Sequence, residues 1–165
     1  MHAKDAILST LDFGDRIVNA YLGDLTDADL LVRPVDGQNH IAWQIGHLIL
    51  SENSMLNMMK PGASPDLPAG FADSYGRDEA STKSDDPSRF LGKDQYLELW
   101  RAQRAATRAY LSAIDDVELD APGPERVRKM CPTIGATLML QGTHPLMHVG
   151  QFVSVRRKLN KPIAI

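Results

Sequence analysis

The sequence predicts an all-α protein, a four-helix bundle with a long crossover between its second and third helices. Apolar residues recur at spacings of three and four in four long stretches, which is the period of an amphipathic helix. Segments rich in Pro, Gly and Asp separate these stretches, and the second separating segment, residues 61–91, is unusually long. Four helices joined in this way form a bundle whose middle two helices need not be antiparallel neighbours.

The first helix is expected from about Lys4 to Leu22, because its apolar residues fall on one face. The second is expected to have Asn39 as its N-cap residue and to run to about Met58, before Pro61. The apolar residues of these two helices are Ile7, Leu8, Leu11, Val18, Tyr21, Leu22, Ile41, Ile45, Leu48 and Leu56.

The third helix is expected from about Lys93 to Ile114, and the segment 122–124, Pro-Gly-Pro, breaks the chain after it. Residues 61–91 show little periodicity, and a loop of this length is often a lid or a pocket wall. This segment and the start of the first helix would set the specificity for a small-molecule substrate.

The last helix is expected to begin with Thr133 as its N-cap residue and to end near Asn160. Pro145 lies inside it, where the ring removes the hydrogen bond to the carbonyl of Gln141 and clashes with that carbonyl. We therefore expect a kink within one turn of His144. Such a kink could turn His144 away from His148.

The composition limits the classes of protein to consider. A chain of 165 residues, here taken as one domain over 1–165, can bury a sizeable core without disulfides or a structural metal. The net charge of −3, without a dominant basic run, argues against nucleic-acid binding. A single cysteine, the absence of a signal-peptide pattern and the absence of a long apolar run predict a cytoplasmic protein that does not bind membranes.

Three histidines suggest a metal site. His144 and His148 are four residues apart and share a helix face, and His47 lies in the second helix. Imidazoles that converge inside a bundle can bind a divalent transition metal and leave positions open for water or substrate. The alternative is that this face looks at solvent, or that the histidines are satisfied core residues. His40 is expected near solvent in the first turn of its helix.

Two segments carry a resemblance to a known family. Residues 39–48, NHIAWQIGHL, and residues 144–151, HPLMHVGQ, followed by RRKL at 156–159, resemble the DinB-like superfamily. The resemblance implies a bundle in up-down-down-up order and places His47, His144 and His148 at a three-histidine metal site. It further implies relation to transferases that use low-molecular-weight thiols such as bacillithiol or mycothiol. The name of the family does not imply nucleic-acid binding.

Imidazole ligands suit zinc or nickel best, and such a metal can lower the pKa of bound water to about 7 or hold a thiol as thiolate. The residues around the histidines offer no well-placed general base, since Glu52 is poorly aligned with the ligand face. Gln151 could bond a ligand histidine or a neighbouring helix. Trp43 could line the substrate pocket, although a tryptophan at this helical spacing is more often a residue of the hydrophobic core. Cys131 is read as incidental.

The resemblance, together with the lack of a well-placed base, thus favours a metal-dependent transferase that joins a low-molecular-weight thiol to small electrophiles. A metal-dependent hydrolase and a non-catalytic bundle that binds a metal or a small molecule remain alternatives. A small-molecule substrate is the expected partner, and a homodimer is compatible with a helical bundle of this kind.

Overall fold

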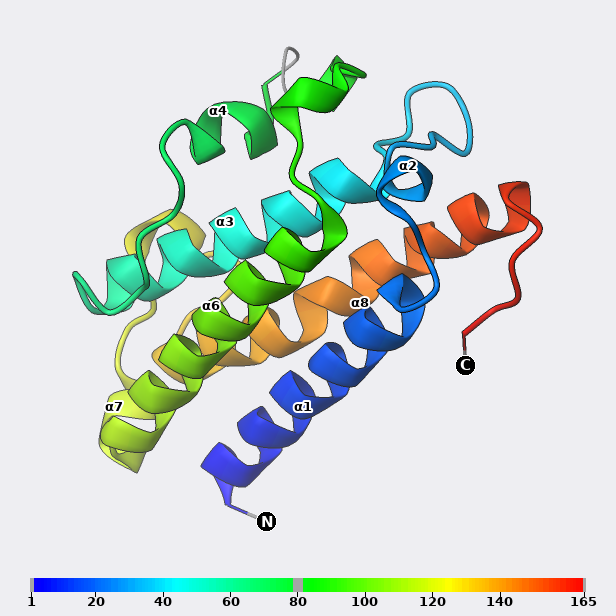
Figure 1. The fold of residues 1–165 in the computed structure, drawn as a ribbon. Helices are drawn as coiled ribbons and strands as arrows, with labels where there is room; N and C mark the ends of the chain where they lie inside the picture. The colour runs from blue at the N-terminus through cyan, green and yellow to red at the C-terminus, as the bar shows by residue number, and fades with distance from the viewer. Residues whose placement is uncertain (1, 79–81, 165) are drawn as a thin grey trace.

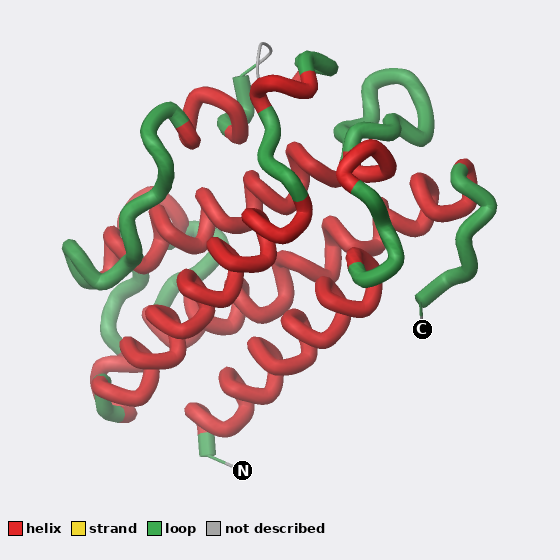
Figure 2. Tube along the Cα trace, viewed as in Figure 1, coloured by secondary structure: helices red, strands yellow, loops and turns green. Residues whose placement is uncertain are grey.

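Four long helices form the bundle. The computed structural model describes residues 2–78 and 82–164, and within these ranges it contains α1 (Ala3–Leu22), α3 (Ile41–Met59), α6 (Lys93–Ala113) and α8 (Ile134–Lys158). In Figure 1, α1 and α8 run in one direction, and α3 and α6 run in the other. Figure 2 shows helices and loops, and none of the described residues forms a strand. The fold is therefore the expected all-α bundle in up-down-down-up order.

Short helices decorate the connections between the long ones. They are α2 (Asp27–Leu30), α4 (Phe71–Tyr75), η1 (Pro87–Arg89), α7 (Asp116–Asp120) and η2 (Glu125–Val127). The long crossover is thus not a featureless loop, because it contains α4 and η1. Phe71 and Tyr75, four residues apart, are both buried against the bundle, and this packing stabilises α4 beyond its local propensity. Residues 79–81 of the crossover lie outside the described part of the chain.

The long helices pack through one small-residue crossing and two apolar clusters. A Cβ on Gly142 would lie 2.3 Å from Thr10 Oγ1, and a Cβ on Gly14 would lie 2.7 Å from the carbonyl oxygen of Gly142. Only glycine therefore lets α1 and α8 approach this closely. The larger cluster joins α1, α3, α6 and α8 around Trp100 and Phe152, and the smaller one lies around Leu111.

The N-cap residue of α3 is His40, not Asn39 as expected. His40 Nδ1 accepts a hydrogen bond of 3.0 Å from the backbone N–H of Trp43. The expectation that His40 lies near solvent is wrong, because its side chain is 0% exposed and contacts Ser84 and Phe90 of the crossover. Burial lowers the pKa of His40 to about 4, which keeps the ring neutral and able to accept.

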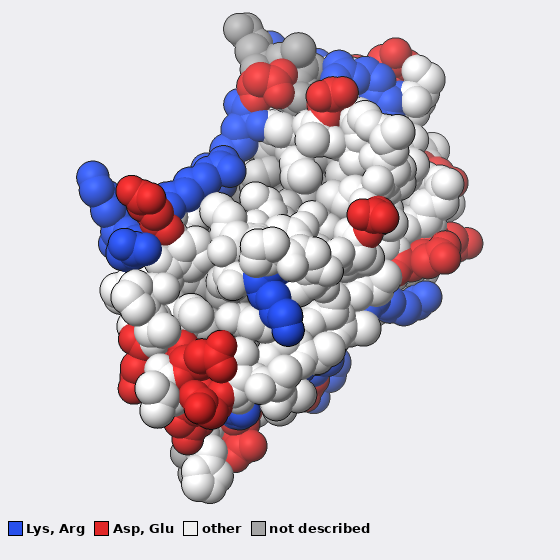
Figure 3. Space-filling model, turned by 90° about the vertical axis from the view of Figure 1, so that its left-hand side faces the viewer, with Lys and Arg blue, Asp and Glu red and all other residues white. Residues whose placement is uncertain are grey.

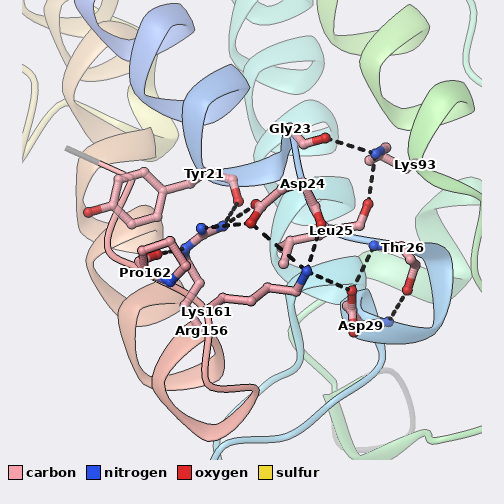
Figure 4. A network of polar contacts seen from close by, with 10 residues as sticks. All are labelled: Tyr21, Gly23, Asp24, Leu25, Thr26, Asp29, Lys93, Arg156, Lys161 and Pro162. Atoms are coloured by element: carbon pink, nitrogen blue, oxygen red, sulfur yellow. Dashed lines mark hydrogen bonds and ion pairs between the residues drawn. The ribbon is translucent and has the colours of Figure 1, made fainter.

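The C-terminal end of α8 is fixed to the end of α1 by a buried arginine. The Arg156 guanidinium donates to both carboxylate oxygens of Asp24 and to the carbonyls of Tyr21 and Pro162 (Figure 4). Lys161 adds a hydrogen bond to the carbonyl of Asp24. Because Arg156 is 1% exposed and its donors are matched to acceptors, this corner holds the two parallel helices in register.

Acidic and basic side chains are interspersed on the face drawn in Figure 3, and most of that face is uncharged. Acidic side chains gather low on it, toward the end of the bundle where α7 lies in Figure 1. Within the described ranges no helix is both long enough and apolar enough to cross a bilayer.

Candidate metal centre

Three histidine side chains from two helices meet inside the bundle. His47 comes from α3, and His144 and His148 come from consecutive turns of α8. One ring nitrogen from each lies within 4.8 Å of the other two. The Nε2 atoms of His144 and His148 are 3.2 Å apart, and the His47 ring centroid lies 5.5 Å from that of His148. The structure therefore brings together all three of the histidines that the sequence suggested.

The spacing of the two nitrogens on α8 matches that of two ligands of one metal ion. Two imidazole nitrogens bound at about 2.0–2.1 Å with a tetrahedral angle between them are about 3.3 Å apart. The His144 and His148 nitrogens, at 3.2 Å, already have this separation. The arrangement fits a divalent transition-metal site, since imidazole is a preferred ligand of such ions and three ligands leave open positions.

Contacts from α4 and α3 orient His47. Its Nδ1 lies 3.2 Å from the carbonyl oxygen of Tyr75, which can only accept, so Nδ1 carries the proton and Nε2 is free to bind a metal. The Trp43 ring stacks on the other side, with ring centroids 4.8 Å apart and planes 7° from parallel. Gly46 lets Tyr75 of α4 approach α3 closely enough for its carbonyl to reach His47, because a Cβ at position 46 would lie 2.2 Å from the Tyr75 ring.

Gln44 orients His148 in the same way. The Gln44 side-chain nitrogen donates to the carbonyl of Asn39 at 2.7 Å, which directs its Oε1 toward His148 Nδ1 at 3.1 Å. The amide oxygen can only accept, so His148 holds its proton on Nδ1 and presents Nε2 to the centre of the group. Acceptors in fixed positions thus hold the protons of His47 and His148 on Nδ1, which leaves the Nε2 atom of each ring unprotonated.

The electrostatic surroundings keep the three rings uncharged. Burial lowers the pKa of His144 to about 4 and that of His148 to about 3, and the neighbouring histidines and Arg77 act in the same direction. Burial lowers the pKa of His47 as well. Neutral imidazole is the form that binds a metal, so the group is ready for one at neutral pH.

Pro145 does not separate the two histidines of α8. The helix continues through it from Ile134 to Lys158, and the Nε2 atoms of His144 and His148 still meet. The carbonyl that Pro145 leaves without its helical partner, that of Gln141, accepts a hydrogen bond from Arg104 at 2.9 Å.

The remaining residues considered from the sequence have other surroundings. Gln151 is exposed on α8, and it is Gln44 that bonds a ligand histidine. Trp43 is buried and backs His47. Glu52 is also buried, where it accepts a hydrogen bond from Thr107 and pairs with a buried arginine. Cys131 is buried, which raises the pKa of its thiol and disfavours the thiolate.

Two supporting contacts were missed from the sequence. Gln44, a polar residue on the apolar second helix three residues before His47, was a signal available in the pattern. The Tyr75 carbonyl carried no such signal, because any residue has a carbonyl. A surface pocket of about 420 Å³, lined by residues 25–27 and 92–95, does not include the histidines.

The fold and this group define a class of protein, the helical bundle with three convergent histidines that fit a metal ion between two of its helices. The model of the DinB superfamily matches residues 10–152, so the chain belongs to the DinB superfamily. A solved structure described as the conserved protein of locus from Enterococcus faecalis superposes with a TM-score of 0.71 over 98% of this chain and 99% of that one. At 19% identity this likeness shows the fold alone. No curated protein matches.

Proposed function

We propose that this protein is a metal-dependent transferase that joins a low-molecular-weight thiol to a small electrophile. The observation that carries the proposal is the donor set, which among the described residues consists of three imidazoles, two buried and one half-buried, without a carboxylate. A divalent metal such as zinc or nickel, held by His47, His144 and His148, would supply Lewis-acid stabilisation of a thiolate at neutral pH. In the net reaction the thiol sulfur bonds to the electrophilic carbon, the leaving group departs with its electron pair, and the thiol proton passes to solvent.

Two features support this chemistry: the candidate ligands are oriented by hydrogen bonds, and the carboxylate considered as a general base is engaged in other contacts. The Tyr75 carbonyl and the Gln44 side chain fix two of the rings, so their Nε2 atoms need little reorganisation. The carboxylate considered as a general base, Glu52, is bonded to Thr107 and paired with Arg104. A hydrolase would need a base within reach of its water, so these contacts favour thiol transfer over hydrolysis.

The metal content of the untagged protein tests the proposal first. Elemental mass spectrometry of the wild type should give close to one divalent metal per chain, and His47→Ala should lose it. Because the core clusters do not depend on the metal, His148→Ala should also lose the metal while it keeps the helical circular dichroism of the wild type. If His148→Ala fails to fold, the metal is structural and the enzymatic proposal loses its basis.

A metal-loaded protein then allows the reaction to be tested. We expect the loaded wild type, and not His47→Ala, to accelerate the loss of a thiol in the presence of an alkyl or epoxide electrophile. Loss of ester or amide substrates without thiol consumption would support the hydrolase alternative. A metal-loaded protein without either activity would support a non-catalytic binding bundle.

A further inference from the structure

The side chain of Arg104 lies where all four long helices meet. It projects from α6 and is 2% exposed. Its Nε lies 2.9 Å from a carboxylate oxygen of Asp15 on α1, and its Nη1 lies 3.3 Å from a carboxylate oxygen of Glu52 on α3. Its Nη2 donates to the carbonyl of Gln141 on α8 at 2.9 Å. The buried guanidinium therefore has two ion-pair partners, on α1 and α3, and one hydrogen bond, to α8, and these contacts hold it in one position.

The acceptor on α8 is a carbonyl that the helix itself cannot satisfy. In a regular helix the carbonyl of Gln141 would accept from the backbone nitrogen four residues later, but residue 145 is proline and has no N–H. A buried carbonyl without a donor is costly, by about 1–3 kcal/mol. Arg104 therefore supplies the donor that Pro145 removes.

The turn fixed in this way carries a candidate metal ligand. His144 lies between Gln141 and Pro145 on the same turn of α8, and it lines the same internal gap as Glu52 and Gln141. His47 and His148 have acceptors for their Nδ1 atoms, whereas among the described residues no such bond is recorded for His144. The position of His144 is therefore set through its backbone.

We propose that Arg104 is a positioning residue of the metal centre, which holds the proline-interrupted turn of α8 so that His144 meets His148 and His47. The inference rests on the proposed metal site and adds to it a residue that is not one of the three candidate ligands. This role also explains the proline next to His144. Pro145 frees the Gln141 carbonyl, and that carbonyl then accepts the hydrogen bond by which Arg104 ties α6 to this turn of α8.

A double-mutant cycle tests the proposal. Pro145→Ala restores a backbone N–H for the Gln141 carbonyl, and Arg104→Lys keeps the positive charge beside Asp15 and Glu52 but removes the planar guanidinium. The matched control is Arg108→Lys. Arg108 lies one turn further along α6, and its ion-pair partners Asp12 and Asp15 both lie on α1. The dissociation constant for Co²⁺, read from its visible absorption in titrations of the full chain, is the measurement.

We expect Arg104→Lys to weaken Co²⁺ binding about tenfold or more in the wild-type background, in the range seen for outer-shell partners. The same change in the Pro145→Ala background should weaken binding less than about threefold, because the helix then satisfies its own carbonyl. Arg108→Lys should change Co²⁺ binding less than about twofold. Equal losses for Arg104→Lys in both backgrounds, or no loss in either, would overturn the proposal.

A second measurement needs no variant and no metal. The Arg104 guanidinium protons should exchange slowly with water in the metal-free wild type, and faster in Pro145→Ala, where the backbone N–H competes for the carbonyl. Rapid exchange in the wild type would overturn the inference even if Arg104→Lys does not fold. If the wild type binds no Co²⁺, the proposed metal site and the inference both fall. If it binds Co²⁺ but the cycle shows no coupling, the inference falls alone.

Discussion

Replacing Gly46 by alanine should displace α4 from the bundle and weaken the hydrogen bond that orients the His47 ring. A Cβ at this position would lie 2.2, 2.3 and 2.6 Å from three atoms of the Tyr75 ring. Carbon atoms in ordinary contact are about 3.5–4.0 Å apart, so the ring has to retreat by more than about 1 Å. Tyr75 is 1% exposed, and its hydroxyl is 2.6 Å from that of Tyr96, so little room exists for this movement.

The size of the expected change in the free energy of unfolding follows from two losses and one gain. Overpacking of a well-packed site costs about 1–3 kcal/mol, and breaking the buried hydroxyl contact adds about 1 kcal/mol. Alanine in place of glycine inside a helix returns about 1 kcal/mol. We expect Gly46→Ala to lower the free energy of unfolding by about 2 kcal/mol, and metal affinity to fall about 10–100-fold because His47 loses the Tyr75 carbonyl.

The matched control is Gly150→Ala on α8. Gly150 is also inside a helix, but a Cβ there meets nothing within 4 Å, so this change should raise the free energy of unfolding by up to about 1 kcal/mol and leave metal binding unchanged. Urea unfolding of the metal-free proteins and Co²⁺ titration measure the two quantities. If Gly46→Ala is as stable as Gly150→Ala and binds Co²⁺ equally well, the contact with Tyr75 does not support His47.

Three further outcomes are expected. Gln44→Leu should weaken metal binding about tenfold or more, measured by chelator competition, while Gln44→Glu keeps an acceptor for His148 and should retain binding; equal losses would refute the role of the acceptor. Both polar atoms of the buried Gln141 side chain lack a partner among the described residues, so Gln141→Leu should raise the free energy of unfolding by about 1 kcal/mol in urea; a decrease would show that the amide has a partner. The pKa of His148 falls from its ordinary value of 6.5 to about 3 on folding, so the unfolded chain binds more protons below pH 6.5. The free energy of unfolding of the metal-free protein should therefore fall from about pH 6.5 downward, and an equally steep fall in His148→Ala would contradict this assignment.

Much of the architecture followed from local patterns. The helix expected from Lys4 to Leu22 forms from Ala3 to Leu22, and Thr133 caps α8 as expected, with its hydroxyl accepting from the backbone N–H of Ala136. Periodicity and capping are properties of neighbouring residues, so the sequence displays them directly. The cap of α3 was misplaced by one residue because histidine can accept through Nδ1 when burial keeps it neutral, and the sequence does not display burial.

The candidate site was likewise predictable from the sequence only in part. The spacing of His144 and His148 placed them on one face of a helix, but the choice between a ligand pair, a solvated face and a core network depended on which helix lies opposite. The structure answers this by placing His47 of α3 against α8. Spacing along the chain indicated Gln151, one turn after His148, whereas the contact that Gln44 makes to His148 joins two helices and leaves no such local pattern.

By itself the sequence determined the helical fold, the approximate limits of its long helices and the placement of His144 and His148 on one helix face, because each of these depends on residues within a few turns of one another. The tertiary structure decided which acceptors orient the rings, that Glu52 is held by Thr107 and Arg104, and that Arg104 replaces the bond lost at Pro145. These contacts join residues 28 or more positions apart, and only the packing of elements in the folded chain brings them close together.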